Sequence, residues 1–326
     1  MRRREFIAGL GGAAAWPMVA RGQQTGKIAK IGFIEAGSQQ ANQIFLDSFN
    51  DGLKALGWIE GNNIVVLDRW AEARSEQLPE IVSGLIQSGV DVLVTASGPA
   101  SVTAKQATST IPIVAVGIPD PVGIGLINSL VRPGGNLTGF SSLSVELTAK
   151  RVQLLQEALP RASRIAVIWN PKDSSARLGE SDAKGAAEKL GLSLLSIEVA
   201  NPNDIEQAFA GLRTSKPDAV FVINDALTVA NRDRIVALAT DLRLPIIAGF
   251  RLFAISGGLL SLGTSLPNDF KRAARLVDKI LRGEKPADLP FEQPTQLELV
   301  VNLKAAKVLG LELPQTLVAR ADELIE

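Results

Sequence analysis

Polar side chains that follow predicted strands are the residues of this sequence best suited to chemistry. The most specific pair is Asn224-Asp225, which comes directly after an apolar strand-like run. A carboxylate at that position can pair with an ammonium group, and the neighbouring amide can hydrogen-bond to a second polar atom of the same molecule. Capping of the next helix is an equally good use of Asp225. The pair therefore indicates either a binding site for a cationic group or a helix start.

A second segment, Ala96-Ser97-Gly98-Pro99, lies between a predicted strand and a predicted helix. Its small side chains let backbone N–H groups approach a bound molecule, and the start of a helix attracts negative charge. The segment is therefore suited to bind a carboxylate. An ordinary Ser cap followed by a proline in the first turn explains the same residues without any ligand.

Other candidates come from further loops at the carboxyl ends of predicted strands, because ligands of open parallel sheets bind there. Asp120 is one of them, although capping of a helix predicted over residues 122–130 competes with a ligand role. The rest are hydroxyl and amide side chains and one aromatic ring near an expected chain crossing. The predicted ligand-binding residues are Ser38, Ala96, Ser97, Gly98, Pro99, Asp120, Ser141, Asn170, Ser174, Ser175, Asn224, Asp225 and Phe250.

The residue types that are missing limit the chemistry further. The chain has no Cys, no His and no Tyr. Disulfides, thiolate nucleophiles, imidazole bases and Cys or His metal ligands are therefore excluded. We expect no catalytic residue, no metal and no cofactor, since Asp, Glu, Lys and hydroxyl groups remain without imidazole help. The alternative is an enzyme that uses Asp120 and Asp225 as an acid/base pair, but no glycosidase motif accompanies them.

Composition and length bound the class of protein. The 34 basic residues are matched by 34 acidic ones, so no long-range attraction to polyanions exists and no nucleic-acid partner is expected. With 46% apolar residues the chain can offset its conformational entropy and fold. A length of 326 residues favours two domains over one large core.

Strand-like and helix-like segments alternate along the chain beyond residue 27. Four or five such units precede a strong turn signal at residues 132–136, after which the alternation starts again. Consecutive strand–helix units predict parallel sheets covered by helices on both faces. The predicted fold is therefore α/β, with two doubly wound parallel-sheet lobes joined by a hinge.

Residues 1–22 have the composition of an export signal. Three arginines at positions 2–4 precede an apolar, small-residue stretch over residues 7–19, and small residues suited to signal peptidase follow. The stretch is shorter than the roughly 20 residues of a bilayer span. The arginines also resemble a twin-arginine signal. We therefore expect a periplasmic protein that is soluble after cleavage; a soluble N-terminal helix with a basic end is the alternative.

With these loops and elements identified, the sequence resembles the ABC-transporter substrate-binding proteins of the tryptophan/tyrosine type. The resemblance implies a type 1 periplasmic-binding fold. It also implies ligand loops at residues 96–99, at Asp120-Pro121 and at Asn224-Asp225, the last pair in reversed order. The motifs that carry it are Leu56-Gly57-Trp58, Ile111-Pro112-Ile113-Val114, Asp120-Pro121-Val122-Gly123, Arg132-Pro133-Gly134-Gly135-Asn136 and Gly283-Glu284-Lys285-Pro286.

The same resemblance implies how such a protein works. A small solute, an amino acid or a related small carboxylate, is trapped between hinged lobes and delivered to an ABC permease in the inner membrane. The first lobe is expected over residues 27–139 plus 258–287, and the second over residues 140–257 plus 288–326. We expect a monomer. A periplasmic sensor partner that hands its ligand-bound form to a receptor remains an alternative.

The absence of His leads to one expectation about pH. Ordinary carboxylates stay ionised between about pH 5.5 and 8, so solute affinity is expected to change little in that range. A steep change would require a strongly shifted Asp or Glu.

Overall fold

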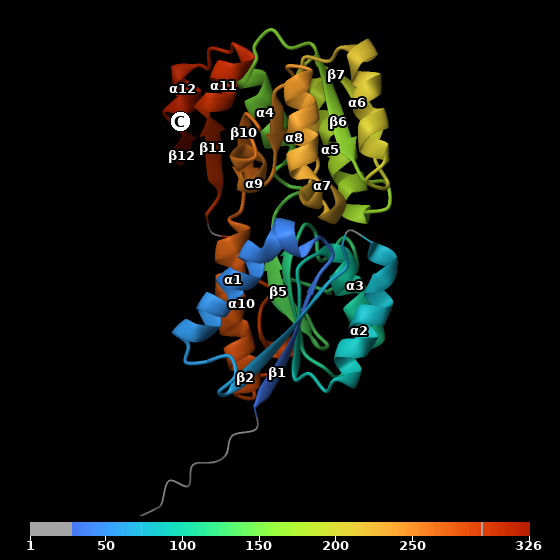
Figure 1. Cartoon of the computed structure of the whole chain (residues 1–326), viewed down its shortest axis with the longest axis vertical. Helices are drawn as coiled ribbons and strands as arrows, with labels where there is room; N and C mark the ends of the chain where they lie inside the picture. Colours follow the sequence, from blue (N-terminus) through green and yellow to red (C-terminus); the bar gives the residue numbers. More distant parts are fainter. Residues whose placement is uncertain (1–27, 73, 295) are drawn as a thin grey trace, which may run out of the picture.

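The computed structural model describes residues 28–72, 74–294 and 296–326. Within them the chain forms two α/β lobes, which lie one above the other in Figure 1. The predicted export signal over residues 1–22 lies outside the described residues. No helix in the described part of the chain is both long enough and apolar enough to span a bilayer.

The first lobe contains a parallel sheet with the strand order β2-β1-β3-β4-β5. Its strands are β1 (Ala29–Glu35), β2 (Ile64–Trp70), β3 (Val92–Thr95), β4 (Ile113–Ile118) and β5 (Leu137–Ser141). β3 is buried along its whole length, as expected for a central strand covered on both faces.

Helices cover both faces of this sheet. α1 and α10 pack together on one face, and α2 and α3 lie on the other (Figure 1). Phe33 of β1 contacts Phe270 of α10 with ring centroids 5.8 Å apart, so a late segment of the chain completes the first core. The elements are α1 (Gln39–Ala55), α2 (Leu78–Gln87), α3 (Gly98–Ala107), α10 (Leu266–Leu281) and the 3₁₀ turns η1 (Ser75–Gln77) and η2 (Pro286–Asp288).

The second lobe contains a sheet with the order β12-β11-β10-β9-β8-β6-β7. All neighbouring strands are parallel except β10 and β11. The predicted class of two doubly wound parallel-sheet lobes is confirmed. The strands are β6 (Arg164–Trp169), β7 (Ser193–Glu198), β8 (Ala219–Val222), β9 (Ile246–Ala248), β10 (Leu260–Gly263), β11 (Glu298–Asn302) and β12 (Glu323–Ile325).

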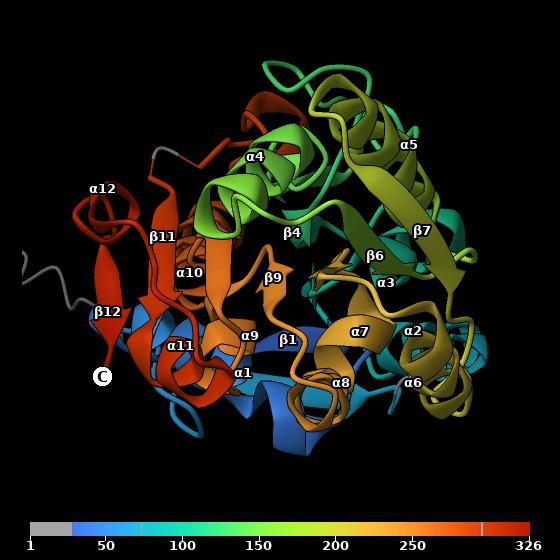
Figure 2. The ribbon, with the colours of Figure 1, turned by 90° about the horizontal axis from the view of Figure 1, so that it is seen from above.

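Helices also enclose the second sheet, as the view from above shows (Figure 2). Buried alanines of α5 let this helix pack closely on the sheet. The helices are α4 (Thr148–Ala158), α5 (Ser174–Lys189), α6 (Asp204–Ser215), α7 (Ala226–Ala230), α8 (Arg232–Asp241), α9 (Arg251–Ile255), α11 (Leu303–Leu309) and α12 (Gln315–Val318).

The points where the chain passes between the sheets differ from the predicted boundaries. β5 continues to Ser141 in the first sheet, and β10 pairs with β9 and β11 in the second sheet although residues 258–287 were assigned to the first lobe. Glu292 still pairs with Phe140 of the first sheet. An apolar strand of four residues carries no local signal for which sheet it joins, so only the pairing reveals the crossings.

The helix predicted over residues 122–130 is wrong, because this segment consists of turns. The Asp120 side chain accepts a hydrogen bond from Gly123 N at 2.8 Å, which closes a tight turn instead of a helix cap. Gly125 has a φ of 71°, which interrupts any helical continuation.

Candidate functional site

A cleft lies where the carboxyl ends of the strands of the two lobes face each other. It contains about 560 Å³ of empty space, its open mouth included. The first lobe contributes the ends of β1, β3 and β4 with parts of α1 and α10, and the second contributes the segments after β6, β8 and β9. The lining residues are Glu35, Asn42, Phe45, Ala96, Ser97, Gly98, Pro99, Val116, Gly117, Pro119, Asp173, Asn224, Asp225, Ala226, Val229, Phe250, Leu266 and Phe270.

The first turn of α3 forms part of the first-lobe wall. Ser97 is the N-cap of this ten-residue helix, and its Oγ accepts a hydrogen bond from Ala100 N at 3.3 Å. Gly98 and Pro99 occupy the first helical positions and line the cleft with it. The predicted helix cap at Ser97 is therefore confirmed, whereas binding of a carboxylate at this helix start stays a prediction.

Glu35 ends β1 and is 2% exposed. One carboxylate oxygen accepts a hydrogen bond from Gly37 N at 2.8 Å, while Oε2 has no partner. Burial raises the pKa of Glu35 to about 7, and hydrogen bonds from Gly37 and Asn42 only partly oppose it. A buried carboxylate with an unpartnered oxygen in a cleft is a strong candidate for ligand contact.

Two carboxylates from the second lobe line the opposite wall. Asp225 is the N-cap of α7 in a capping box with Thr228, and Asn170 Nδ2 donates a hydrogen bond to its Oδ2 at 2.6 Å. Asp173 is the N-cap of α5 and accepts from Ala176 N at 2.8 Å. Burial, followed by the nearby charge of Asp225, raises the pKa of Asp173 to about 6.

Asn224 and Phe250 complete the second-lobe wall. The Oδ1 atom of Asn224 accepts a hydrogen bond from Gly249 N at 2.8 Å, and its buried Nδ2 has no partner. Phe250 precedes α9 and faces an apolar part of the cleft that also contains Phe45 and Phe270. The last two rings are stacked 5.0 Å apart. The cleft therefore has a polar, acidic part and an aromatic part.

The charge of the cleft is one-sided. Glu35, Asp173 and Asp225 line it, and no Lys or Arg is among the described residues that do. The described part of the chain has no cluster of acidic residues that can hold a metal ion. The expected insensitivity of solute affinity to pH assumed carboxylates with ordinary pKa values, and burial raises the pKa of Glu35 to about 7 and that of Asp173 to about 6.

Seven of the predicted residues line this space: Ala96, Ser97, Gly98, Pro99, Asn224, Asp225 and Phe250. The other six do not. Ser38 caps α1, Asp120 closes its turn, and Ser141 accepts from Leu143 N at the end of β5. Asn170 donates a hydrogen bond to Asp225 without lining the cleft, and Ser174 is exposed at the start of α5. Ser175 lines a neighbouring, smaller pocket.

Several lining residues were not among the thirteen predicted ligand-binding residues. Glu35, which follows the first predicted strand, was a weaker candidate for the cleft, and Asp173 lies at a helix start where a search for every acidic loop residue finds it. Asn42, Phe45, Leu266 and Phe270 lie on α1 and α10. Their helical periodicity indicates only core positions, so no sequence signal separates them from ordinary packing residues.

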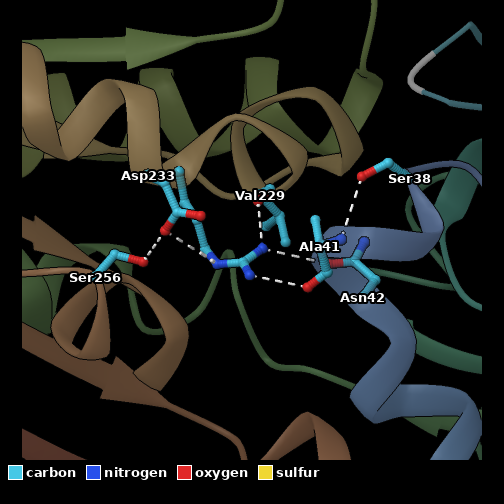
Figure 3. A network of polar contacts seen from close by, with 7 residues as sticks. Ser38, Ala41, Asn42, Val229, Asp233 and Ser256 are labelled. Atoms are coloured by element: carbon cyan, nitrogen blue, oxygen red, sulfur yellow. Dashed lines mark hydrogen bonds and ion pairs between the residues drawn. The ribbon is translucent and has the colours of Figure 1, made fainter.

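Arg232 connects the two lobes at the edge of the cleft. It is the first residue of α8, and its Nη2 donates to the carbonyl oxygen of Ala41 in α1 at 2.8 Å. Its Nη1 donates to Val229 O at 3.0 Å and reaches Asn42 Oδ1 at 3.4 Å. Figure 3 shows Ala41 and Asn42 on α1 opposite Val229 and Asp233 of the second lobe. These bonds hold the lobes together over the cleft.

Two doubly wound lobes that enclose a charged cleft define a solute-binding protein with the type 1 periplasmic-binding fold. Residues 27–325 match the family described as ABC transporter substrate binding protein. The chain belongs to this family. A tyrosine-binding protein from Clostridioides difficile (strain R20291) is 28% identical over 280 residues, which are 84% of this chain and 80% of that protein.

Two solved structures show how the lobes are arranged. An ABC domain in complex with L-Trp from Streptococcus pneumonia has a TM-score of 0.84 at 25% identity and covers 92% of this chain and 100% of its own. A ligand-free, open substrate binding protein with adhesive properties from Clostridium difficile has a TM-score of 0.65 at 26% identity, covering 92% and 99%. At similar identity and coverage, this chain is therefore more similar in structure to the L-Trp complex than to the ligand-free, open protein.

Proposed function

We propose that this protein is the extracytoplasmic solute-binding component of an ABC importer and traps an amino acid between its lobes. The observation that carries the proposal is the convergence of carboxylates from both lobes on one enclosed space without a basic residue among the described lining. An ammonium group suits Glu35, Asp173 and Asp225, because its three N–H donors can reach oxygens on different sides.

The carboxylate of the solute is proposed to lie at the first turn of α3. Ser97 and Gly98 line the cleft there, and the backbone N–H groups and dipole of a helix start favour negative charge. This position is on the first lobe, whereas two of the three carboxylates are on the second. A zwitterion therefore joins the lobes electrostatically when the cleft closes.

The side chain of the solute is proposed to contact the aromatic part of the cleft. Phe45, Phe250 and Phe270 supply rings, and Val229 and Leu266 supply aliphatic surface. Such a wall favours an apolar or aromatic side chain. The names of the tyrosine-binding relative and of the L-Trp complex support the same class of solute.

In this proposal the protein binds its solute and does not convert it chemically. The solute shifts the protein toward the closed arrangement, which the membrane permease recognises, because the contacts of both lobes are made together only in that state. In this proposal the mature protein is a periplasmic monomer without a cofactor, without enzymatic activity and without a nucleic-acid partner. Its partners are the solute and the permease.

The test is a binding screen of the purified protein against the common amino acids and small aromatic acids. A true ligand at 100 times its dissociation constant adds about 2.7 kcal/mol to the free energy of unfolding, which thermal shift detects readily. Calorimetry on the hits then gives affinities. The proposal fails if no amino acid stabilises the protein, or if mass spectrometry finds the bound compound chemically converted.

A further inference from the structure

A second charged space lies beside the cleft, around Arg151 of α4. This side chain is 2% exposed, and its hydrogen bonds go to backbone carbonyl groups. Nε donates to Leu262 O at 2.7 Å and Nη1 donates to Ser144 O at 2.6 Å. Nη2 is buried and has no hydrogen-bond partner among the described residues. One donor group of the guanidinium therefore remains available for a hydrogen bond.

The charge of Arg151 is also not balanced by an ion pair within the described residues. Among the described residues, no carboxylate oxygen lies within ion-pair distance of it, and Glu146, which favours its charged form electrostatically, is exposed. Burial lowers the pKa of Arg151 to about 9. A buried cation without an anion is strongly unfavourable. Such a group either destabilises the hinge or belongs to a binding site that a bound anion completes.

The space next to Arg151 has the composition of an anion site. Its described lining contains no acidic residue. Ser175, which is 5% exposed, contributes a hydroxyl, and Asn224 contributes a buried Nδ2 without a hydrogen-bond partner. Its empty space, with the open mouth included, is about 250 Å³, less than half that of the cleft. It is lined by Pro119, Ser144, Val145, Thr148, Arg151, Ser175, Gly179, Phe221, Ile223 and Asn224.

A glycine allows Arg151 and Asn224 to lie close together. A Cβ atom at Gly249 would meet Arg151 Nη2 at 2.8 Å and Asn224 Oδ1 at 3.2 Å. Arg151 and Asn224 therefore both pack against Gly249. The absence of a side chain there leaves room for the guanidinium itself.

We propose that this Arg151 pocket binds a small monovalent anion, a carboxylate group or a halide, held by Arg151 Nη2 with Asn224 Nδ2 and the Ser175 hydroxyl. The anion neutralises the buried guanidinium. Because Arg151 also binds carbonyls next to two of the chain crossings, at Ser144 and Leu262, the anion stiffens the hinge. Two sources supply this chemistry: a free ion, or, if the protein traps an amino acid as proposed, a solute carboxylate that enters this pocket in place of the first turn of α3.

The test uses bromide alone as the probe. We expect sodium bromide to raise the Tm of the solute-free protein by a few degrees over sodium isethionate at equal ionic strength, with saturation. Crystals grown in bromide should show an anomalous peak within hydrogen-bond distance of Arg151 Nη2. An unchanged Tm in wild type, or no peak at that atom, overturns the proposal.

Two variants separate binding from general salt effects. Arg151→Gln should lose the bromide response. If it does not fold, Asn224→Asp gives the same information, because it keeps the acceptor for Gly249 N and introduces a carboxylate beside Arg151, so bromide should no longer stabilise. The matched control is Arg272→Gln, whose guanidinium already has Asp269 and Glu292 as partners and which should respond to bromide as wild type does. An equal response in all four proteins overturns the proposal.

Calorimetry identifies the source of the anion. The best amino acid from the binding screen is titrated in bromide and in isethionate. Weaker binding in bromide shows that the carboxylate of the solute and bromide compete for the Arg151 pocket. Unchanged or stronger binding shows that a free anion remains beside the solute. If no solute binds at all, the proposed function fails while the bromide result still decides the Arg151 pocket.

Discussion

The cleft and the Arg151 pocket are neighbours with opposite charge. Both are lined by Pro119 and Asn224, yet the described lining of the cleft has three carboxylates and no base, and that of the Arg151 pocket has a guanidinium and no acid. In both the cleft and the Arg151 pocket, most polar side-chain atoms form hydrogen bonds within the protein and a few do not. Glu35 Oε2 and Arg151 Nη2 are buried without a hydrogen-bond partner among the described residues, and the two proposals place a bound group at each of them.

The two regions also differ in what else their charges do. Asp173 and Asp225 each cap a helix, so they would remain even in a protein that binds nothing. Arg151 holds backbone carbonyls at the hinge. A structural role and a ligand role are thus combined in one side chain, and only variants that keep the first can test the second.

The largest expected effect is at Asp225. Asp225→Asn keeps a good N-cap but removes the charge, so solute affinity should fall by roughly ten- to a hundredfold, the range for a hydrogen bond to a charged group. The free energy of unfolding without solute should change little. Asp225→Ala should show the same affinity loss and about 1 kcal/mol of destabilisation from the lost cap.

Calorimetry and chemical denaturation measure these two effects separately. Asp204→Asn is the matched control, because that side chain accepts hydrogen bonds from Ala200 N and Asn201 N away from the cleft. Wild-type affinity in Asp225→Asn would remove this carboxylate from the site.

The second effect is a pH dependence that belongs to the acidic cleft alone. Glu35 and Asp173, with pKa values of about 7 and about 6, lose their charge as the pH falls from 8 to 5.5. An ammonium group prefers the ionised forms, so affinity should fall several-fold on acidification. Glu35→Gln should flatten the part of this profile near pH 7. Identical profiles in wild type and Glu35→Gln would contradict the role of Glu35.

The stability of the solute-free protein should respond in the opposite direction. The folded pKa values of Glu35 and Asp173 are raised above their unfolded values, so the folded state binds more protons between about pH 4 and 7. The free energy of unfolding from these groups therefore falls as the pH rises. Denaturation at pH 5.5 and 8 should show a loss of stability at the higher pH without solute and a smaller loss with saturating solute; equal losses in the two cases would contradict the assignment.

The sequence predicted the cleft residues that directly follow a strand better than those that a later helix brings to the cleft. Asn224-Asp225 and residues 96–99 were found because a strand end followed by small or polar residues has one position in a parallel sheet. Phe270 was not found, because α10 joins the first lobe only after the chain has built most of the second. Asp120 was assigned to the site although its carboxylate closes a turn, since Asp-Pro has the same sequence signature in both settings.

The third effect concerns the bond that closes the acidic cleft. Arg232→Ala removes the hydrogen bonds to Ala41 O and Asn42 Oδ1 across the lobes. We expect solute affinity to fall by roughly three- to tenfold, about 1 kcal/mol, because the closed state becomes less favourable. Small-angle scattering of the solute-free protein should show a larger radius of gyration.

Arg234→Ala is the matched control for this variant. Arg234 pairs with Glu206 inside the second lobe and makes no contact across the cleft among the described bonds. Equal effects of the two substitutions would show that Arg232 does not hold the lobes together.

The smallest effect separates the two pockets. Gly249→Ala places a methyl group against Arg151 Nη2, so the bromide response should weaken several-fold while solute affinity changes by less than about twofold. Gly185→Ala on α5 is the control, because nothing lies within 4 Å of its added Cβ. A larger loss of solute binding than of bromide binding would show that the solute reaches into the Arg151 pocket.

The most direct test of the central claim is calorimetric titration of the best amino acid from the screen against its N-acetyl derivative. The acetyl group removes the positive charge and keeps the carboxylate and side chain. If three carboxylates receive an ammonium group, the amino acid binds and the N-acetyl derivative binds at least a hundredfold more weakly, a difference of about 2.7 kcal/mol. Equal affinities would contradict the account.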